Sequence, residues 1–166
     1  MITSTANAQV KELIRLMKKS RAREDAGVFI VEGPRMAGEL TDDPAWQERI
    51  ERVYLSESYA AKHKGEQDGL RRTSRVEILA DNVFDHVSDT KTPQGILAVV
   101  KRKEYDLADI IGGQQGNSLV IVLDNLQDPG NLGTIFRTAE AAGATGILLS
   151  RDCVDIYNPK VIRSTM

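Results

Sequence analysis

The chain of 166 residues contains one cysteine, Cys153, and two histidines, His63 and His86. A single cysteine can form no internal disulfide, and these three side chains do not have the spacing of a zinc site. No apolar run approaches the roughly 18–20 residues that a membrane-spanning helix needs, and the N-terminus lacks the apolar core of a signal peptide. We therefore expect a cytoplasmic protein without a structural metal.

Acidic and basic side chains nearly balance, since the formal net charge is only −2. Residues 1–24 nevertheless carry six basic side chains against Glu12 and Glu24. The six are Lys11, Arg15, Lys18, Lys19, Arg21 and Arg23. Phosphate binding depends on local charge, so this segment could attract RNA even on a weakly acidic protein. The alternative is an ordinary solvated helix face, and charge alone does not separate the two.

The hydrophobic pattern changes period after the first twenty residues. Four apolar side chains recur at helical spacing: Val10, Leu13, Ile14 and Met17. They predict a helix over residues 7–20. Short apolar runs at 28–32, 53–56, 76–79 and 95–100 then alternate with helical segments. This alternation is typical of a mainly parallel sheet covered on both faces, and it predicts an α/β domain over residues 1–103.

Residues 104–117 are polar and rich in glycine, glutamine and asparagine, which is typical of a linker. A second unit is expected over residues 118–166. It begins with one βαβ unit, formed by a strand at 118–124, a helix at 132–142 and a strand at 146–150. Asn158 and Pro159 then have the pattern of a helix start.

The turn between the first strand and the helix of this second unit, DPGNLG, is its most informative segment. Asn131 is expected to cap the helix, and Gly143 to take the left-handed conformation at its end. Gly130 and Gly133 allow the backbone to approach a ligand, and free N–H groups at a helix start favour an anion.

Arg137 is the only basic residue of the predicted helix at 132–142. The apolar stripe of that helix consists of Leu132, Ile135, Phe136 and Ala139. Arg137 therefore points away from the stripe and could hold a phosphate or carboxylate near the turn. The alternative is a surface arginine paired with Glu140, with Asn131 serving only as a cap. The spacing matches neither the dinucleotide fingerprint nor a P-loop, which weakens a third interpretation, an enzyme that binds a small nucleotide.

The segment LDNLQDPGNLGTIFRTAEAAGATGILLS resembles the first motif of the SpoU/TrmH family of RNA ribose 2′-O-methyltransferases, in the SPOUT superfamily. YNPKVIRSTM (157–166) is similar to the family's next segment. Residues 1–103 are similar to the N-terminal substrate-binding domain of many of these enzymes, through Asn7, Lys11, FIVEGPRM (29–36) and DTKTPQGILAVV (89–100). That domain folds like the small ribosomal proteins that bind kink-turn RNA.

The resemblance implies methyl transfer from S-adenosylmethionine to a ribose 2′-hydroxyl of rRNA or tRNA, by a homodimer with a C-terminal trefoil knot. Arg137 then corresponds to the catalytic arginine and Asn131 to the asparagine that holds the active-site geometry. A guanidinium is a poor proton acceptor, so we expect Arg137 to bind phosphate and polarise the hydroxyl. Contact with RNA is favoured for four basic residues: Lys11, Arg15, Lys18 and Arg23.

The family's later motifs, which build the cofactor pocket and the knot, are not found in this sequence. A unit of 49 residues is also too small to cover both faces of a parallel sheet. We therefore expect a piece of a longer methyltransferase that cannot methylate RNA alone. A natural short protein is the alternative, and in that case the rival function is an RNA-binding module without chemistry.

Overall fold

The computed structural model describes residues 1–111 and 118–165, apart from the side chains of residues 66–68, 72 and 73. Contacts divide the chain into two compact units, which we call unit 1 (Met1–Arg102) and unit 2 (Lys103–Met166). Within the segment predicted as a linker, residues 107–111 instead form helix α8 (Leu107–Ile111) of unit 2. Its last residues pack on a strand of that unit, and the remainder of the predicted linker, 112–117, lies outside the described residues.

Unit 1 is built on a four-stranded sheet in the order β1-β4-β2-β3. The strands are β1 (Val28–Glu32), β2 (Ile50–Ser56), β3 (Arg75–Leu79) and β4 (Ile96–Lys101). Only β2 and β3 pair in parallel, because β4 lies between β1 and β2 and is antiparallel to both. The prediction of a mainly parallel sheet is therefore wrong. A central strand buried on both faces is equally apolar in either direction, so its composition does not report its direction.

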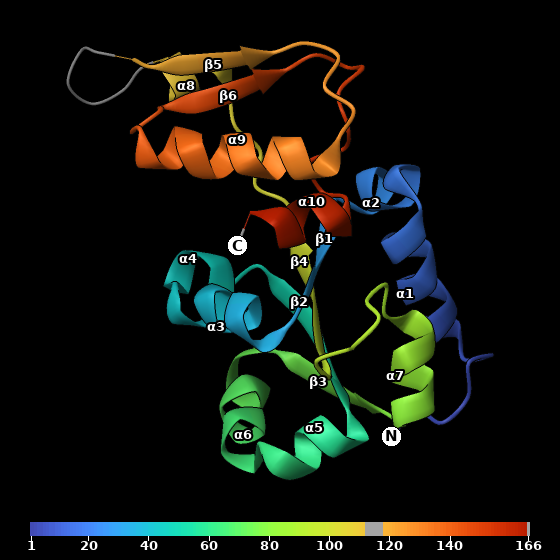
Figure 1. Cartoon of the computed structure of the whole chain (residues 1–166). Coiled ribbons are helices and arrows are strands. Elements are labelled where there is room, and N and C mark those ends of the chain that lie inside the picture. Colours follow the sequence, from blue (N-terminus) through green and yellow to red (C-terminus); the bar gives the residue numbers. More distant parts are fainter. Residues whose placement is uncertain (112–117, 166) are drawn as a thin grey trace. The chain divides into compact units, whose positions relative to one another are not determined.

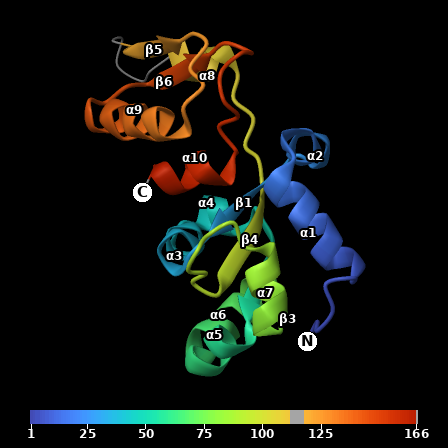
Figure 2. The same cartoon turned by 45° about the vertical axis from the view of Figure 1, so that its right-hand side comes forward.

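Helices cover both faces of this sheet (Figures 1 and 2). One face carries α1 (Ala8–Lys18), α2 (Ser20–Ala26) and α7 (Asp81–Val87). The other carries α3 (Pro34–Asp42), α4 (Pro44–Gln47), α5 (Glu57–Lys62) and α6 (Lys64–Thr73). The largest fully buried side chains of the first face include Leu13 of α1, Phe84 of α7 and Leu97 of β4. Their burial from water is the main stabilising contribution to unit 1.

The predicted N-terminal helix is present as α1, and a second short helix follows it. Asn7 caps α1, since its side-chain oxygen accepts a hydrogen bond from the backbone N–H of Gln9 at 2.8 Å. Lys19 then adopts an extended conformation, with φ −118° and ψ 115°, and ends α1. The second helix, α2, ends at Gly27, whose φ of 64° is the left-handed conformation that glycine tolerates best.

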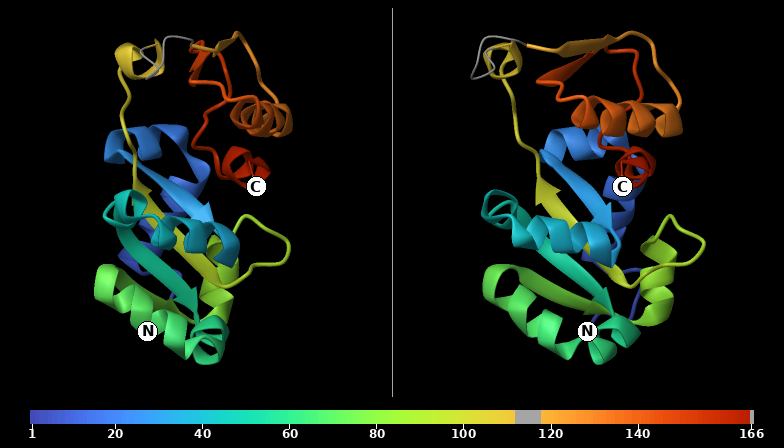
Figure 3. Two further views of the ribbon diagram at one scale, coloured as in Figure 1. Left: turned by 90° about the vertical axis from the view of Figure 1, so that its left-hand side faces the viewer. Right: turned by 60° about the vertical axis from the view of Figure 1, so that its left-hand side comes forward.

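Unit 2 contains the predicted βαβ unit. Strands β5 (Val120–Leu123) and β6 (Gly146–Leu149) are parallel, and α9 (Pro129–Ala141) connects them and lies along one face of the pair (Figure 3). Gly143 has a φ of 71°, which confirms the predicted left-handed residue. Asn158 caps α10 (Pro159–Ser164), also as predicted, by accepting from the N–H of Lys160 at 3.0 Å. No helix in the described ranges combines the length and apolarity needed to cross a bilayer.

Candidate functional site

The loops after β5 and β6 meet at the carboxyl ends of these parallel strands. Ligands of open α/β sheets bind at this edge. Here the loops are hydrogen-bonded to one another: Asn125 N donates to Ser150 Oγ at 3.0 Å, and Val154 N donates to the Leu126 carbonyl at 2.8 Å. Asn125 has a φ of 51°, which asparagine tolerates better than most residues. This cross-linking fixes the path of the chain into the start of α9.

Asp128, not Asn131, caps α9. The Asp128 carboxylate accepts a hydrogen bond from the N–H of Asn131 at 2.6 Å, and the helix begins at Pro129. The predicted cap at Asn131 is therefore wrong, because the helix begins three residues earlier than predicted and Asn131 lies inside its first turn. The Asn131 N–H is also not free to bind an external anion as expected, since it already donates to the Asp128 carboxylate. Asn131 itself is exposed on the first turn.

Gly133 is a packing residue. A Cβ at this position would collide with Ser164 of α10, so only glycine allows the two helices to approach this closely. The Ser164 hydroxyl lies 3.0 Å from the Pro129 carbonyl and 2.7 Å from the Val161 carbonyl. The close approach predicted for this glycine therefore exists, but it is to α10, which ties the start of α9 to the end of α10.

Arg137 projects from the exposed side of α9 toward α10. Its Nη1 donates to the Ser164 carbonyl, and its Nη2 lies 3.4 Å from Thr134 Oγ1. The predicted orientation away from the apolar stripe is confirmed, because Leu132 and Ala139 are buried whereas Arg137 is exposed. The guanidinium thus contacts α10 and Thr134 rather than Glu140. The sequence did not predict the contacts of Arg137 with Ser164 and Thr134, because neither residue forms a known pairing pattern with an arginine at that spacing.

The site places Asn131 and Arg137 on one helix. They stand six positions apart in the sequence, which corresponds to about 9 Å along the axis. The same six positions turn the side chain by about 600°, so the two leave the helix about 120° apart and a substrate contacting both would reach partly around the first half of α9. Asn131 can donate and accept hydrogen bonds there, and Arg137 supplies positive charge and a planar set of donors.

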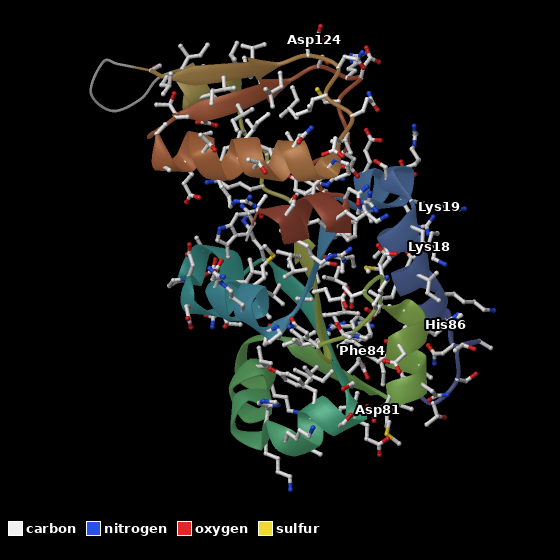
Figure 4. The ribbon with its side chains drawn as sticks, viewed as in Figure 1. Lys18, Lys19, Asp81, Phe84, His86 and Asp124 are labelled. Carbon is white, nitrogen blue, oxygen red and sulfur yellow. The ribbon has the colours of Figure 1, made fainter. Side chains whose placement is uncertain are left out.

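The basic side chains of α1 lie on its outer surface. Lys11 and Lys18 are exposed, and Lys18 and Lys19 extend away from the body of unit 1 (Figure 4). Arg15 is bound by Glu12, with Nε to Oε2 at 2.8 Å and Nη2 to Oε1 at 3.0 Å. This hydrogen-bonded pair raises the pKa of the Arg15 guanidinium, which keeps its charge. Lys11 and Lys18 of α1, together with Lys19 just after its end, therefore form what we call the basic face of α1, with Arg15 partly neutralised beside them.

Arg23 does not belong to this face. Its side chain is only 2% exposed, and Nη1 donates to the carbonyls of Leu16 at 2.7 Å and Met17 at 3.2 Å. These carbonyls belong to the last turn of α1, where backbone acceptors lack partners within the helix. The predicted RNA contact at Arg23 is therefore corrected: its charge is used inside the fold, because α2 turns back and directs the guanidinium at the end of α1.

Two family models match the sequence. One, the MRM3-like substrate binding domain, covers residues 7–98, more than half of the chain. The other, the SpoU rRNA Methylase family, covers residues 118–166. The chain belongs to the SpoU/TrmH family of RNA methyltransferases. The two matches fall on the two units, with the Arg137 helix inside the second.

Curated relatives of this SpoU/TrmH chain support the assignment. Human mitochondrial rRNA methyltransferase 3 is 33% identical over 165 residues, which is 95% of this chain and 37% of the relative. The 23S rRNA (guanosine(2553)-2′-O)-methyltransferase RlmP of Bacillus subtilis is 31% identical over 163 residues, 98% of this chain and 59% of the relative. The chain thus spans between about a third and three fifths of the length of these proteins.

Solved structures show the same fold. An rRNA methyltransferase from Sinorhizobium meliloti superposes with a TM-score of 0.80 at 28% identity, covering 99% of this chain and 60% of that one. An AdoMet-bound rRNA methyltransferase structure from the same organism gives 0.80 at 27% identity, covering 99% and 59%. The fold class expected from the SpoU/TrmH resemblance is confirmed: a substrate-binding α/β domain followed by the start of a methyltransferase domain.

At the carboxyl edge of β5 and β6, polar groups bond across the two loops, as Leu126 N does to Cys153 Sγ at 3.4 Å. We therefore assign no residue of unit 2 to a cofactor. Nor do the described histidines, cysteine and carboxylates form any group of three that could hold a metal ion.

Proposed function

We propose that the protein containing this chain transfers a methyl group from S-adenosylmethionine to a ribose 2′-hydroxyl of rRNA or tRNA. The observation that carries the proposal is Arg137, exposed on α9 one turn after the DPGNLG segment that starts the helix, within the segment matched by the SpoU model. Support comes from the matched substrate-binding domain and from the relative named as a 2′-O-methyltransferase.

Arg137 acts by position and charge. Its guanidinium stays protonated at neutral pH, so it cannot serve as the base that removes the hydroxyl proton. It binds a phosphate next to the target ribose and polarises the 2′-hydroxyl, while phosphate or water accepts the proton. The contact with the Ser164 carbonyl orients the guanidinium before RNA arrives. Asn131 holds the ribose in place from the first turn.

The cofactor, the assembly and the location belong to the same proposal. S-adenosylmethionine is the methyl donor, and its contacts lie mainly in residues outside this chain. The complete protein is a homodimer and is cytoplasmic. Calorimetry of S-adenosylmethionine with residues 1–166 and with the product of the complete reading frame tests the cofactor: we expect binding by the longer protein only. Equal binding by both would place the site within this chain.

The experiment that tests the function is methyl transfer from labelled S-adenosylmethionine to total RNA by the product of the complete reading frame. Arg137→Ala should lower the rate roughly 100- to 1,000-fold, the usual effect of removing a key electrostatic group. Arg151→Ala, which removes another exposed arginine of unit 2, should leave the rate unchanged. RNA binding without any methyl transfer would favour the RNA-binding module instead.

A further inference from the structure

Unit 1 contains a groove of about 700 Å³ between α1 and the sheet. It lies at one edge of the sheet, where β1, β2 and β3 begin and the antiparallel β4 ends. The helix borders the groove from Ala8 to Leu16, and Figure 2 shows α1 alongside the strands. None of the lysines of the basic face of α1 lines the groove, so the two surfaces are distinct.

The floor of the groove is apolar. It includes Leu13 of α1, Val28 of β1 and Val99 of β4, which belong to the core cluster between this helix and the sheet and are at most 7% exposed. Tyr54 of β2 adds a ring with a polar end. Burial raises the pKa of the Tyr54 phenol, and the neighbouring Arg52 only partly offsets this, so the hydroxyl stays neutral. A floor of this composition favours an apolar group of a ligand.

Two arginines stand side by side at the rim of the groove. Arg52 and Arg75 are partners in the parallel register of β2 and β3, so their side chains leave the same face of the sheet about 4.8 Å apart. Arg52 Nη1 donates to Gln9 Oε1 of α1 at 2.7 Å, which identifies that face as the groove side. Among the described side chains, no carboxylate forms an ion pair with either arginine. Their charge is therefore available to an external anion.

The carboxylates of the rim distinguish between classes of anion. Glu12 already accepts hydrogen bonds from Arg15, and Glu51 Oε1 lies 3.6 Å from Lys101 Nζ. A chain of phosphates in this groove would meet these two carboxylates as well as the arginines, and like charges repel. A single carboxylate can instead lie between the two guanidinium groups, whose paired N–H donors match its geometry. The rim thus favours an isolated carboxylate over a nucleic-acid backbone.

We propose that this groove binds a segment of another protein in which an acidic residue stands next to an apolar one. The acidic side chain lies between Arg52 and Arg75, and the apolar side chain lies on the floor beside Leu13 and Val99. Arginine and tyrosine around an apolar centre with a charged rim are typical of protein-binding surfaces. Because the lysines of the basic face of α1 lie outside the groove, unit 1 can hold this partner and RNA at the same time.

The probe is the peptide acetyl-GLDLG-amide, added to residues 1–166 and followed by NMR. We expect it to shift the amide signals of Leu13, Arg75 and Val99. Its neutral isostere acetyl-GLNLG-amide should bind at least about ten-fold more weakly, the usual loss for a hydrogen bond to a charged group. The peptide acetyl-GSDSG-amide, which keeps the carboxylate but lacks the apolar side chains, should also bind more weakly. These readouts need no methyl transfer, so they are independent of the proposed function.

Substitutions at the rim test the carboxylate position, with circular dichroism confirming that each variant is folded. Arg75→Ala should weaken binding of the aspartate peptide about ten-fold. The matched control is Arg71→Ala, which removes an exposed arginine of α6 that does not line the groove. Arg75→Glu is the sharper variant: it should lose the aspartate peptide and bind acetyl-GLKLG-amide instead. Such a reversal of preference requires direct contact and cannot result from a damaged fold.

Absence of peptide binding, or equal affinity for the aspartate and asparagine peptides, would overturn the proposal. So would an Arg75→Glu variant that still prefers the aspartate peptide. An unstructured single-stranded RNA is the competitor in the last arm, and we expect it to leave the peptide bound and to bind Arg75→Ala as tightly as wild type. Displacement of the peptide by this RNA, together with weaker RNA binding by Arg75→Ala, would assign the groove to RNA phosphates instead of a protein.

Discussion

At the scale of single residues, burial decides what each arginine does. Arg23 is enclosed, and its guanidinium replaces water at the carbonyls of Leu16 and Met17. Arg137 is exposed, and its guanidinium is oriented by the Ser164 carbonyl. The first is bound to the fold and the second is positioned for a ligand. Helical periodicity predicts the outward orientation of Arg137, whereas the local sequence of Arg23 gives no sign of its burial.

Arg23→Ala should lower the free energy of unfolding by about 1–3 kcal/mol, since it leaves buried carbonyls at the end of α1 without their donor. Urea unfolding measures the change. Arg21→Ala, two residues earlier, removes an exposed arginine paired with Asp25 at 3.0 Å, and it should cost less than about 0.5 kcal/mol. Equal effects of the two substitutions would contradict the structural role of Arg23.

Asp81 should make the stability of unit 1 depend on pH in acid. Its carboxylate accepts hydrogen bonds from Ser58 N at 3.0 Å and Ser58 Oγ at 2.7 Å, and these bonds lower the pKa of Asp81 below its ordinary value. A lowered folded-state pKa stabilises the fold above the unfolded value, and this contribution is lost as pH falls through the folded value.

The stability difference between wild type and Asp81→Asn should therefore be present at pH 6 and shrink below about pH 4. It should remain under about 1 kcal/mol because the group is exposed. Urea titrations at several pH values measure it, and Asp85→Asn on the same helix is the control. A difference that grows toward low pH would contradict the assignment.

At the scale of elements, α9 combines a cap, a packing surface and the candidate catalytic arginine. Asp128 caps the start of the helix, and Gly133 lets α10 pack closely against it. These features fix the direction in which Arg137 leaves the helix. A stable frame of this kind is what an electrostatic role requires, because the charge must already be in place when the substrate binds.

Asp128→Ala should lower the free energy of unfolding by about 1 kcal/mol, the usual cost of losing an N-cap. Asn131→Ala should change stability by only a few tenths of a kcal/mol, since its side chain does not cap α9, yet it should reduce methyl transfer by the complete protein. Thermal unfolding and methyl-transfer rates separate the two effects. A larger loss of stability in Asn131→Ala than in Asp128→Ala would contradict the observed cap.

Most elements could be predicted from periodicity, but their arrangement could not. The strand at 28–32 and the helix starting after Asn158 agree with the sequence prediction, because burial and capping are local properties. The direction of β4 and the packing of helix α8 depend on partners distant in the sequence. At the site, the orientation of Arg137 followed from helical periodicity, whereas its hydrogen bond to Ser164 did not.

At the scale of the whole molecule, the chain joins a substrate-binding unit to the first part of a methyltransferase unit. We propose that unit 1 attracts the RNA and that unit 2 contributes to methyl transfer. A net charge of −2 is compatible with RNA binding, because the basic face of α1 concentrates positive charge on one surface. Attraction through that face must weaken as salt screens it.

Replacing Lys11, Arg15, Lys18 and Lys19 by alanine should weaken RNA binding and flatten its dependence on salt. The logarithmic slope should fall by about 0.7 for each phosphate of single-stranded RNA that the protein no longer neutralises. Filter binding at several salt concentrations measures both the affinity and the slope. Lys64→Ala combined with Arg151→Ala is the control for removal of exposed charge elsewhere. Unchanged affinity and slope in the α1 variant would show that RNA does not bind to this face.

The most direct test of the central claim is the position of the methyl group on the product RNA. RNA methylated by the product of the complete reading frame is digested with alkali, which cleaves only next to a free 2′-hydroxyl. The account predicts that the label is recovered in an alkali-resistant dinucleotide, and that Arg137→Ala slows its appearance roughly 100- to 1,000-fold. Recovery of the label in mononucleotides would mean that a base is methylated, and would contradict the assignment to the ribose.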